Sequence, residues 1–213
     1  MKIQRIAIDL GRYEFRPRSL SEFGARARLL LCGRFVEKKG IPYAIKGLRI
    51  VREHYPNIEL RIVGDGPLYE DIQGLIKKLG VEKQVSLLGF LPHAEYIEEL
   101  KQAHILITPS VTAADGDSEG GAPTVLLEAQ ASGLPVLSTY HADIPNVVLA
   151  GESGFLVPER NAEALAERLL YLLQHHKEWG KMGQVGRRYV EAKHNVHLEI
   201  ARLESRYLSL MGA

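Results

Sequence analysis

Short apolar runs rich in Val, Ile and Leu alternate along this chain with amphipathic stretches of helical length. A strand buried on both faces is apolar at nearly every position, and parallel neighbours are joined by helical crossovers. The alternation therefore predicts an α/β fold, with one parallel sheet covered by helices on both faces. Six runs are predicted strands: residues 28–34, 58–63, 85–89, 105–109, 135–139 and 154–157.

The stretches between these runs are predicted helices. Gly80 and Gly133 follow two of them and are typical helix stops. A longer, almost continuous helical pattern covers residues 177–210, and residues 1–27 are predicted to be a linker or a strand that leads into the sheet. The predicted helices within the sheet region are residues 41–54, 68–79, 96–101, 124–132 and 161–175.

Composition narrows the class of protein. The chain has 27 Lys+Arg against 26 Asp+Glu, a net charge of +1, which argues against a nucleic-acid-coating or membrane-surface protein. Its only cysteine, Cys32, excludes an internal disulfide and a cysteine-cluster metal site. The apolar runs are far shorter than the roughly 20 residues that span a bilayer, and the charged residues within 1–10 do not fit a signal peptide.

The loop after the first predicted strand, residues 33–40, carries Arg34 and Lys39 between Gly33 and Gly40. In an open parallel sheet, ligands bind beyond the carboxyl ends of the strands. Two cations close to a helix N-terminus suit an anionic ligand. A solvated basic loop is the alternative.

The second predicted strand is followed by Gly64-Asp65-Gly66-Pro67. A Gly-x-Gly after a strand resembles a dinucleotide fingerprint, but Tyr69 stands where the third glycine belongs, so a nicotinamide cofactor site is not expected. A tight turn and close backbone approach to a ligand both remain open.

Residues 110–123 form a long loop, called the acidic loop below, that contains Asp115, Asp117 and Glu119. These acids match the first positions of a calcium loop, but the twelfth position is Leu126 rather than an acid. A metal-binding Asp-x-Asp pair at 115 and 117 is a second possibility. We expect no metal and no other cofactor.

The end of this loop favours a phosphate more strongly. Gly120, Gly121 and Ala122 leave backbone N–H groups unobstructed at a helix N-terminus, where the main chain and the helix dipole can hold an anion. Glu128 lies further on, in an otherwise apolar run. Its burial would require donors such as vicinal sugar hydroxyls, and the alternative is a Glu128 that faces water.

Several motifs, taken in order, resemble the nucleotide-sugar-binding half of retaining GT-B glycosyltransferases of family four. The resemblance covers residues 28–190. The motifs are Gly-Arg-Phe-x-x-x-Lys-Gly at 33–40, Val-Gly-Asp-Gly-Pro at 63–67, Leu-Gly-Phe at 88–90, Pro-Ser at 109–110, paired glutamates at 119 and 128, Ala-Ser-Gly-Leu-Pro-Val at 131–136 and Glu-Ser-Gly-Phe-Leu-Val-Pro at 152–158.

This resemblance implies a Rossmann-like three-layer domain and a role for each matching residue. Arg34 and Lys39 would clamp the donor diphosphate and stabilise the leaving charge. Glu119 would lie near the transferred sugar, as a third catalytic residue, and Glu128 would hold the ribose hydroxyls. The further donor-binding residues are Gly33, Gly64, Gly66, Gly89, Phe90, Gly120, Gly121, Thr124 and Val125.

The implied activity is transfer of a hexose from a nucleoside diphosphate sugar to a saccharide or lipid-linked acceptor. The acidic loop and residues 141–145 further resemble a bacterial branch that acts in exopolysaccharide and colanic-acid-like assembly. The resemblance implies a cytoplasmic enzyme, peripheral to the inner face of the membrane at full length. Alternatives are a non-catalytic nucleotide-sugar-binding or structural subunit, and a fragment of a GT-B-like sugar-nucleotide epimerase.

The chain departs from the family in two ways. Glu119 and Glu128 enclose eight residues instead of seven, which affects the placement of Glu119. GT-B enzymes also have two domains, whereas this sequence predicts a linker (1–27), one donor domain (28–190) and its C-terminal helix (191–213). We therefore expect an acceptor-binding N-terminal domain to be absent, the isolated chain to be inactive, and the apolar stripe of the last helix to favour self-association.

A few other residues are predicted to have structural roles. Cys32 and Trp179 are predicted core residues, and the histidines at 175, 176, 194 and 197 are predicted to lie at the surface. His141 and Asp143 follow the fifth strand, where a His141 that faces solvent or packs in the core and a helix-capping Asp143 are favoured over a proton-handling pair.

Overall fold

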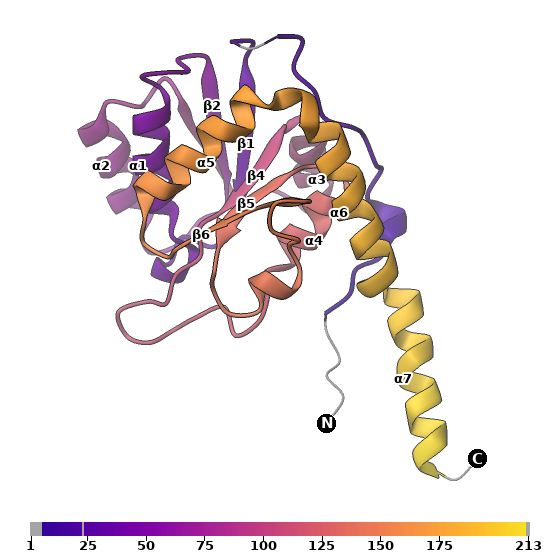
Figure 1. Ribbon diagram of the computed structural model, residues 1–213. Coiled ribbons are helices and arrows are strands. Elements are labelled where there is room, and N and C mark those ends of the chain that lie inside the picture. Colours follow the sequence, from indigo (N-terminus) through magenta and orange to yellow (C-terminus); the bar gives the residue numbers. More distant parts are fainter. Residues whose placement is uncertain (1–5, 23, 212–213) are drawn as a thin grey trace.

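The six predicted strands form one sheet in which every neighbouring pair is parallel. The computed structural model describes residues 6–22 and 24–211 (Figure 1). The strand order is β3-β2-β1-β4-β5-β6, so the chain reverses direction across the sheet between β1 and β4. The strands are β1 (Ala27–Cys32), β2 (Ile58–Val63), β3 (Val85–Gly89), β4 (Ile105–Thr108), β5 (Val136–Thr139) and β6 (Gly154–Val157).

Helices cover both faces of this sheet, which confirms the predicted three-layer fold. Leu29 and Leu31 of β1 face one cluster of buried apolar residues, and Leu30 faces the other. Both faces are therefore withdrawn from water, as the continuous apolar runs predicted. The first cluster includes α1 (Ile41–Val51), α2 (Tyr69–Leu79) and α5 (Ala162–Gln174), and the second includes α3 (His93–Gln102), α4 (Thr124–Ala131) and the last turns of α6 (Trp179–Lys193).

In the sheet region, two helix boundaries differ from the sequence prediction by three residues, and the others agree within one residue. α1 ends at Val51, three residues early, and α3 begins at His93, three residues before the predicted start at Tyr96. The first turn of α3 follows Pro92 and is largely polar, so apolar periodicity did not detect it. Gly80 and Gly133 have φ angles of 63° and 86° after α2 and α4, which confirms both predicted stops.

The almost continuous helical pattern over 177–210 is largely confirmed, but it forms two helices, because an interruption at His194-Asn195 separates α6 from α7 (Val196–Met211). The N-terminal segment occupies the break: the N–H of Ile8 donates to His194 O at 2.9 Å, and the N–H of Val196 donates to Ile8 O at 3.1 Å. This pairing buries His194, and His176 is buried beside Trp179, so the predicted surface position of these two histidines is wrong. Trp179 is a core residue, as predicted.

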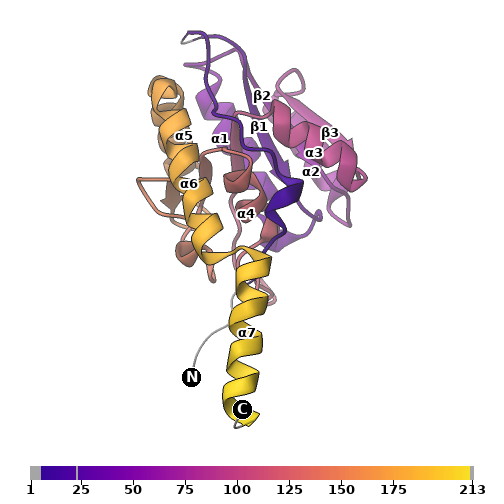
Figure 2. The ribbon, with the colours of Figure 1, turned by 90° about the vertical axis from the view of Figure 1, so that its right-hand side faces the viewer.

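Helix α7 projects away from the body of the domain (Figure 2). None of its residues is buried. Ile200, Leu203, Tyr207 and Leu210 are all exposed, and their spacing places them on one face of the helix. In the described part of the chain, no helix combines the length and the apolar character that crossing a membrane requires.

Arg18 fastens the N-terminal segment to the second layer of helices. Its side chain is buried and donates to Leu100 O and Lys101 O at the end of α3, and to Ser132 O at the end of α4, at 2.6–3.1 Å. A cation at a helix C-terminus satisfies carbonyl groups that have no partner within the helix and interacts favourably with the helix dipole. Burial lowers the pKa of Arg18 to about 10, which still leaves it charged at neutral pH.

Replacing Arg18 by methionine should lower the free energy of unfolding by about 2–3 kcal/mol, because three buried carbonyl groups lose charged hydrogen bonds. Urea denaturation of the parent and of Arg18→Met measures this difference. Arg12 belongs to the same segment but is exposed, so Arg12→Met is the matched control and should change stability by less than about 0.5 kcal/mol. Equal effects of the two variants would contradict the anchoring role of Arg18.

Candidate functional site

The candidate site lies at the carboxyl ends of β1 and β4, where the strand order reverses. Loops diverge at such a point and leave a crevice, which is where ligands bind in open α/β sheets. Three segments converge there: residues 33–40 after β1, residues 64–67 after β2, and residues 109–123 between β4 and α4.

Glycines allow the loops after β1 and β2 to pack closely together. A Cβ atom on Gly64, which has φ 135°, would lie 2.0 Å from Gly33 O. The N–H of Gly33 donates to Val63 O, and the N–H of Phe35 donates to Asp65 O. Close packing between two loops of the chain therefore accounts for the Gly-x-Gly after β2.

Arg34 and Lys39 differ in their surroundings. The Arg34 guanidinium is exposed and, within the described residues, has no hydrogen bond or ion pair with the protein. The Lys39 Nζ atom lies 2.9 and 2.8 Å from the two carboxylate oxygens of Glu119. One predicted cation is therefore available to a ligand, while the other already faces a predicted catalytic carboxylate.

Glu119 is the most firmly held residue of the acidic loop. Its side chain is 6% exposed, and besides Lys39 it accepts a hydrogen bond from Ser110 Oγ at 2.8 Å. Its backbone N–H donates to His141 Nε2 at 3.1 Å. The longer spacing between the paired glutamates therefore leaves Glu119 directed toward the loop after β1.

Lys38 holds another part of the acidic loop through an ion pair and a hydrogen bond. Lys38 donates to Asp117 Oδ1 and to Ser118 O, each at 3.0 Å. In the described ranges, no group of three or more His, Cys, Asp or Glu side chains is placed so that it could hold a metal ion. Of the Asp-x-Asp pair, Asp117 therefore contacts a lysine, and its backbone N–H donates to Asp115 Oδ1 at 2.9 Å.

The N-terminus of α4 presents unpaired donors. Within residues 24–211, the backbone N–H groups of Gly120, Gly121 and Ala122 donate to no acceptor of the chain. A Cβ atom added to Gly120 or Gly121 would meet no protein atom within 4 Å, so open space lies beside these glycines. Thr124 and Val125 form the first turn of the helix behind them.

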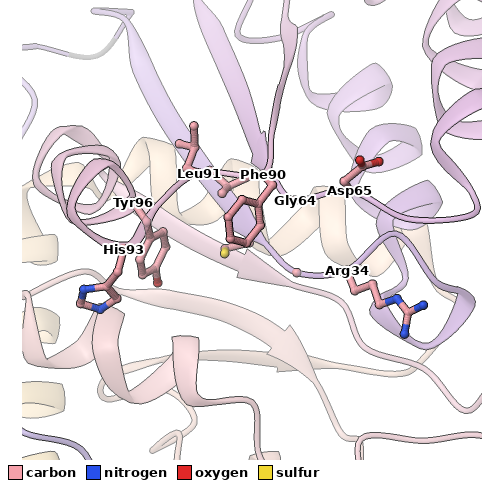
Figure 3. Close-up of a pocket in the computed structure, with 10 residues that line it drawn as sticks. Arg34, Gly64, Asp65, Phe90, Leu91, His93 and Tyr96 are labelled. Atoms are coloured by element: carbon pink, nitrogen blue, oxygen red, sulfur yellow. The ribbon is translucent and has the colours of Figure 1, made fainter.

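A pocket of about 520 Å³ adjoins these loops at the ends of β1, β2 and β3. Phe90 follows β3 and is 80% exposed, so an apolar ring stands free at the mouth of the pocket (Figure 3). Gly89, just before it, has a φ of 69°, which turns the chain out of the strand. The lining residues are Cys32, Gly33, Arg34, Val63, Gly64, Asp65, Phe90, Leu91, His93 and Tyr96.

Glu128 lies next to residues that line this pocket. It is half-buried on α4, and its carboxylate is close enough to affect the ionisation of Tyr13, Tyr96 and Cys32. Burial raises the pKa of both tyrosines, and the negative charge of Glu128 raises it further. The alternative of a Glu128 that faces only water is therefore wrong.

The sequence analysis missed part of the pocket wall. His93 and Tyr96 of α3 line the pocket. Tyr13 of the N-terminal segment contacts this wall, because its hydroxyl lies 3.4 Å from His93 Nε2. The helical pattern that starts at Tyr96 pointed to α3 but not to its first turn. Nothing local marked Tyr13, because only tertiary packing brings residue 13 beside residue 93.

His141 and Asp143 each have a hydrogen-bond partner in the loops beyond β5. His141 is buried, and its Nδ1 atom lies 2.7 Å from Glu159 Oε1. Asp143 accepts a hydrogen bond from the side chain of Asn146 instead, and it does not cap the short helix that follows through a side-chain hydrogen bond. The packing role of His141 is confirmed, and its partner is a glutamate that the sequence analysis did not single out.

Comparisons with known proteins agree with this arrangement. The sequence model of the family described as "Glycosyl transferases group 1" matches residues 14–189. WcaL of Escherichia coli (strain K12), a protein named for colanic acid biosynthesis, is 40% identical over 167 residues. That match covers 78% of this chain and 40% of WcaL, so the chain spans less than half of its relative's length.

Two solved structures share the fold. Sucrose-phosphate synthase from Thermosynechococcus elongatus has a TM-score of 0.83 at 21% identity, over 99% of this chain and 53% of that one. Anabaena HepE, solved in complex with UDP-glucose, has a TM-score of 0.79 at 19% identity, over 95% of this chain and 56% of HepE. The chain belongs to the group 1 glycosyltransferase family, which confirms the resemblance seen in its motifs.

The placement of Glu128 can be tested through Cys32, the only cysteine. Burial raises the pKa of the Cys32 thiol to about 12, and the Glu128 carboxylate adds to the rise. Because the thiolate is the reactive form, alkylation by iodoacetamide at pH 8 should be roughly a thousandfold slower than for a free thiol. Its rate should keep rising tenfold per pH unit up to about pH 11, whereas a free thiol levels off near its ordinary pKa of about 8.5.

Removing the carboxylate charge with Glu128→Gln should lower the pKa of Cys32 and speed the reaction at pH 8. Glu152→Gln, at an exposed position after β5, is the charge-matched control and should leave the rate unchanged. Urea-unfolded chain should react at the rate of a free thiol. A rate that levels off near pH 9 in the folded chain would contradict the raised pKa of Cys32.

Proposed function

We propose that this chain is the nucleotide-sugar-binding half of a retaining glycosyltransferase that transfers a hexose from a nucleoside diphosphate sugar. The observation that carries the proposal is the Lys39–Glu119 contact at 2.8 Å. It lies near the 520 Å³ pocket and the N–H groups of residues 120–122, just before α4, which have no acceptor in the described part of the chain. In a nucleotide sugar, the transferred sugar is bonded directly to the diphosphate. The Lys39 ammonium could bind the diphosphate and the adjacent Glu119 carboxylate could contact the sugar, so this pair suits the bond between the two.

The diphosphate is proposed to lie between the loop after β1 and the start of α4. Arg34 offers a guanidinium that has no partner among the residues the structure describes, and Lys39 adds a second positive charge. The N–H groups of Gly120 and Gly121 and the helix dipole of α4 complete the site. These groups would stabilise the charge that develops on the leaving diphosphate as the glycosidic bond breaks.

The nucleoside is proposed to occupy the pocket beyond Gly33 and Gly64. Phe90 offers a free apolar ring that can contact the base, and Glu128 can accept hydrogen bonds from the ribose hydroxyls. Gly66, in the loop after β2, and Val125, in the first turn of α4, are further residues proposed to bind the donor. The complex of HepE with UDP-glucose supports a nucleotide-sugar ligand for this fold.

Catalysis is proposed to require the second domain of a longer protein, because the matched relatives extend well beyond this chain. That domain would bind a saccharide or lipid-linked acceptor. The similarity to WcaL supports a place in exopolysaccharide or cell-envelope glycan synthesis. We further propose that the full-length enzyme acts in the cytoplasm, at the inner face of the membrane, without nucleic acid as a partner.

The test is calorimetric titration of the chain with ADP, GDP, UDP and dTDP and with hexose conjugates such as UDP-glucose and GDP-mannose. We expect saturable binding of one base in the presence of EDTA, since protein groups supply the positive charge. Lys39→Ala and Arg34→Ala should each weaken binding at least tenfold, and Glu128→Ala less. A Lys39→Ala variant that binds as tightly as the parent would contradict the diphosphate site.

Two Gly→Ala variants, one at the proposed diphosphate site and one away from it, make the binding test more specific. Gly121→Ala adds a methyl group into space that no protein atom fills, at a position without a positive φ, so it should weaken nucleotide binding while leaving the melting temperature unchanged. Gly74→Ala, on the exposed side of α2, is the matched control and should leave binding intact. If the parent binds no nucleotide, the chain is better described as a structural subunit. Release of a free nucleoside diphosphate would distinguish a transferase from an epimerase.

We also propose that the exposed apolar face of α7 packs against the missing half in the longer protein and against a second copy in the isolated chain. Leu203→Glu with Tyr207→Glu should then shift a concentration-dependent sedimentation coefficient to that of a monomer. Ser205→Glu with Ser209→Glu adds the same charge to the opposite side of the helix and should not. A parent that is monomeric at all concentrations would contradict self-association.

A further inference from the structure

His141 lies where β5 gives way to the loop, and both of its ring nitrogens have partners. Its Nε2 atom accepts the backbone N–H of Glu119 at 3.1 Å, and its Nδ1 atom lies 2.7 Å from Glu159 Oε1. A nitrogen that accepts an N–H carries no proton, so the proton of the neutral ring belongs on Nδ1, where it is donated to Glu159. The surroundings of His141 thus specify one tautomer.

Glu159, after β6, holds this ring from the other side. Its second carboxylate oxygen accepts the N–H of Thr112 at 2.8 Å. Burial alone would raise the pKa of Glu159, but hydrogen bonds from Thr112 and His141 outweigh it and leave the pKa below its ordinary value. A charged Glu159 and a neutral His141 therefore connect the beginning of the acidic loop, at Thr112, with its end at Glu119.

The backbone around this pair is strained. Ala142 and Arg160 have φ angles of 46° and 58° and are the two residues other than glycine with positive φ in the described part of the chain. They directly follow His141 and Glu159. Strained backbone persists where surrounding contacts fix it, and Arg160 is fixed by hydrogen bonds to Thr112 O and to the Glu37 carboxylate.

We infer that His141 is a positioning residue for Glu119, with Glu159 orienting the imidazole. The ring is 3% exposed, so it acts through Glu119 rather than by touching a ligand. By fixing the backbone of Glu119, it directs the carboxylate to Lys39 and Ser110. The functional consequence of this inference rests on the proposed function, in which Glu119 faces the transferred sugar. Loss of His141 should therefore weaken binding of the nucleotide sugar and should not weaken binding of the free nucleoside diphosphate.

The tautomer provides a test that needs no ligand. Long-range ¹⁵N–¹H correlation spectra of the chain with labelled histidine report which ring nitrogen carries the proton, and His141→Gln identifies the signal of His141. We expect a neutral ring protonated at Nδ1 at neutral pH. A ring protonated at Nε2, or at both nitrogens, would overturn the inference, because neither form can accept the N–H of Glu119.

The functional test compares UDP with UDP-glucose, and GDP with GDP-mannose, by calorimetry. For the pair that the parent binds, His141→Ala should leave the affinity for the diphosphate within about twofold and weaken the hexose conjugate about tenfold. His141→Gln should restore part of the loss, because an amide offers one acceptor and one donor. Equal weakening of both ligands, or no change in either, would overturn the positioning role.

His104 supplies the matched control. Its Nδ1 atom also accepts a backbone N–H, that of Arg28 at 3.0 Å, but at the amino ends of β1 and β4, away from the site. His104→Ala should lower stability and leave the ratio of the two affinities unchanged. A parent that binds no nucleotide would refute the proposed function, while the tautomer of His141 would still confirm or overturn its contact with Glu119.

Discussion

The contact between Lys39 and Glu119 connects two loops that the sheet alone would leave apart. One loop follows β1 and the other follows β4, and helical crossovers lead from these two strands to opposite sides of the sheet. Charged hydrogen bonds in a partly dry environment are stronger than neutral ones, so this contact fixes the geometry of the crevice. Ser110 holds the same carboxylate through a second hydrogen bond.

The acidic loop shows how a segment without a helix or strand can be held in one conformation. Its backbone and side chains are bound by Glu37, Lys38 and Lys39 from one direction, and by His141 and Glu159 from another. Each of these contacts is modest by itself, but together they define both ends of the loop. The strained backbone at Ala142 and Arg160 is consistent with such multiple fixing.

Much of the fold could be predicted from the sequence because a strand buried on both faces must be apolar throughout. Three strands, Ile58–Val63, Val85–Gly89 and Gly154–Val157, have the predicted bounds. The interruption between α6 and α7 could not be predicted, because the pattern there remains helical and the backbone that pairs with it is that of Ile8, nearly 190 residues away in sequence. The burial of His194 follows from the same contact.

The sequence by itself determined the order of strands and helices, the loops that carry Arg34, Lys39, Glu119 and Glu128, and the family. These properties depend on local pattern and on motifs that can be read in order along the chain. Only the tertiary structure decided that Lys39 meets Glu119, that Glu128 lies beside Tyr13 and Tyr96, and that His141 joins Glu119 to Glu159. Each of these contacts joins residues from separate loops or helices, and their distance in space is set by how the sheet and its covering helices pack.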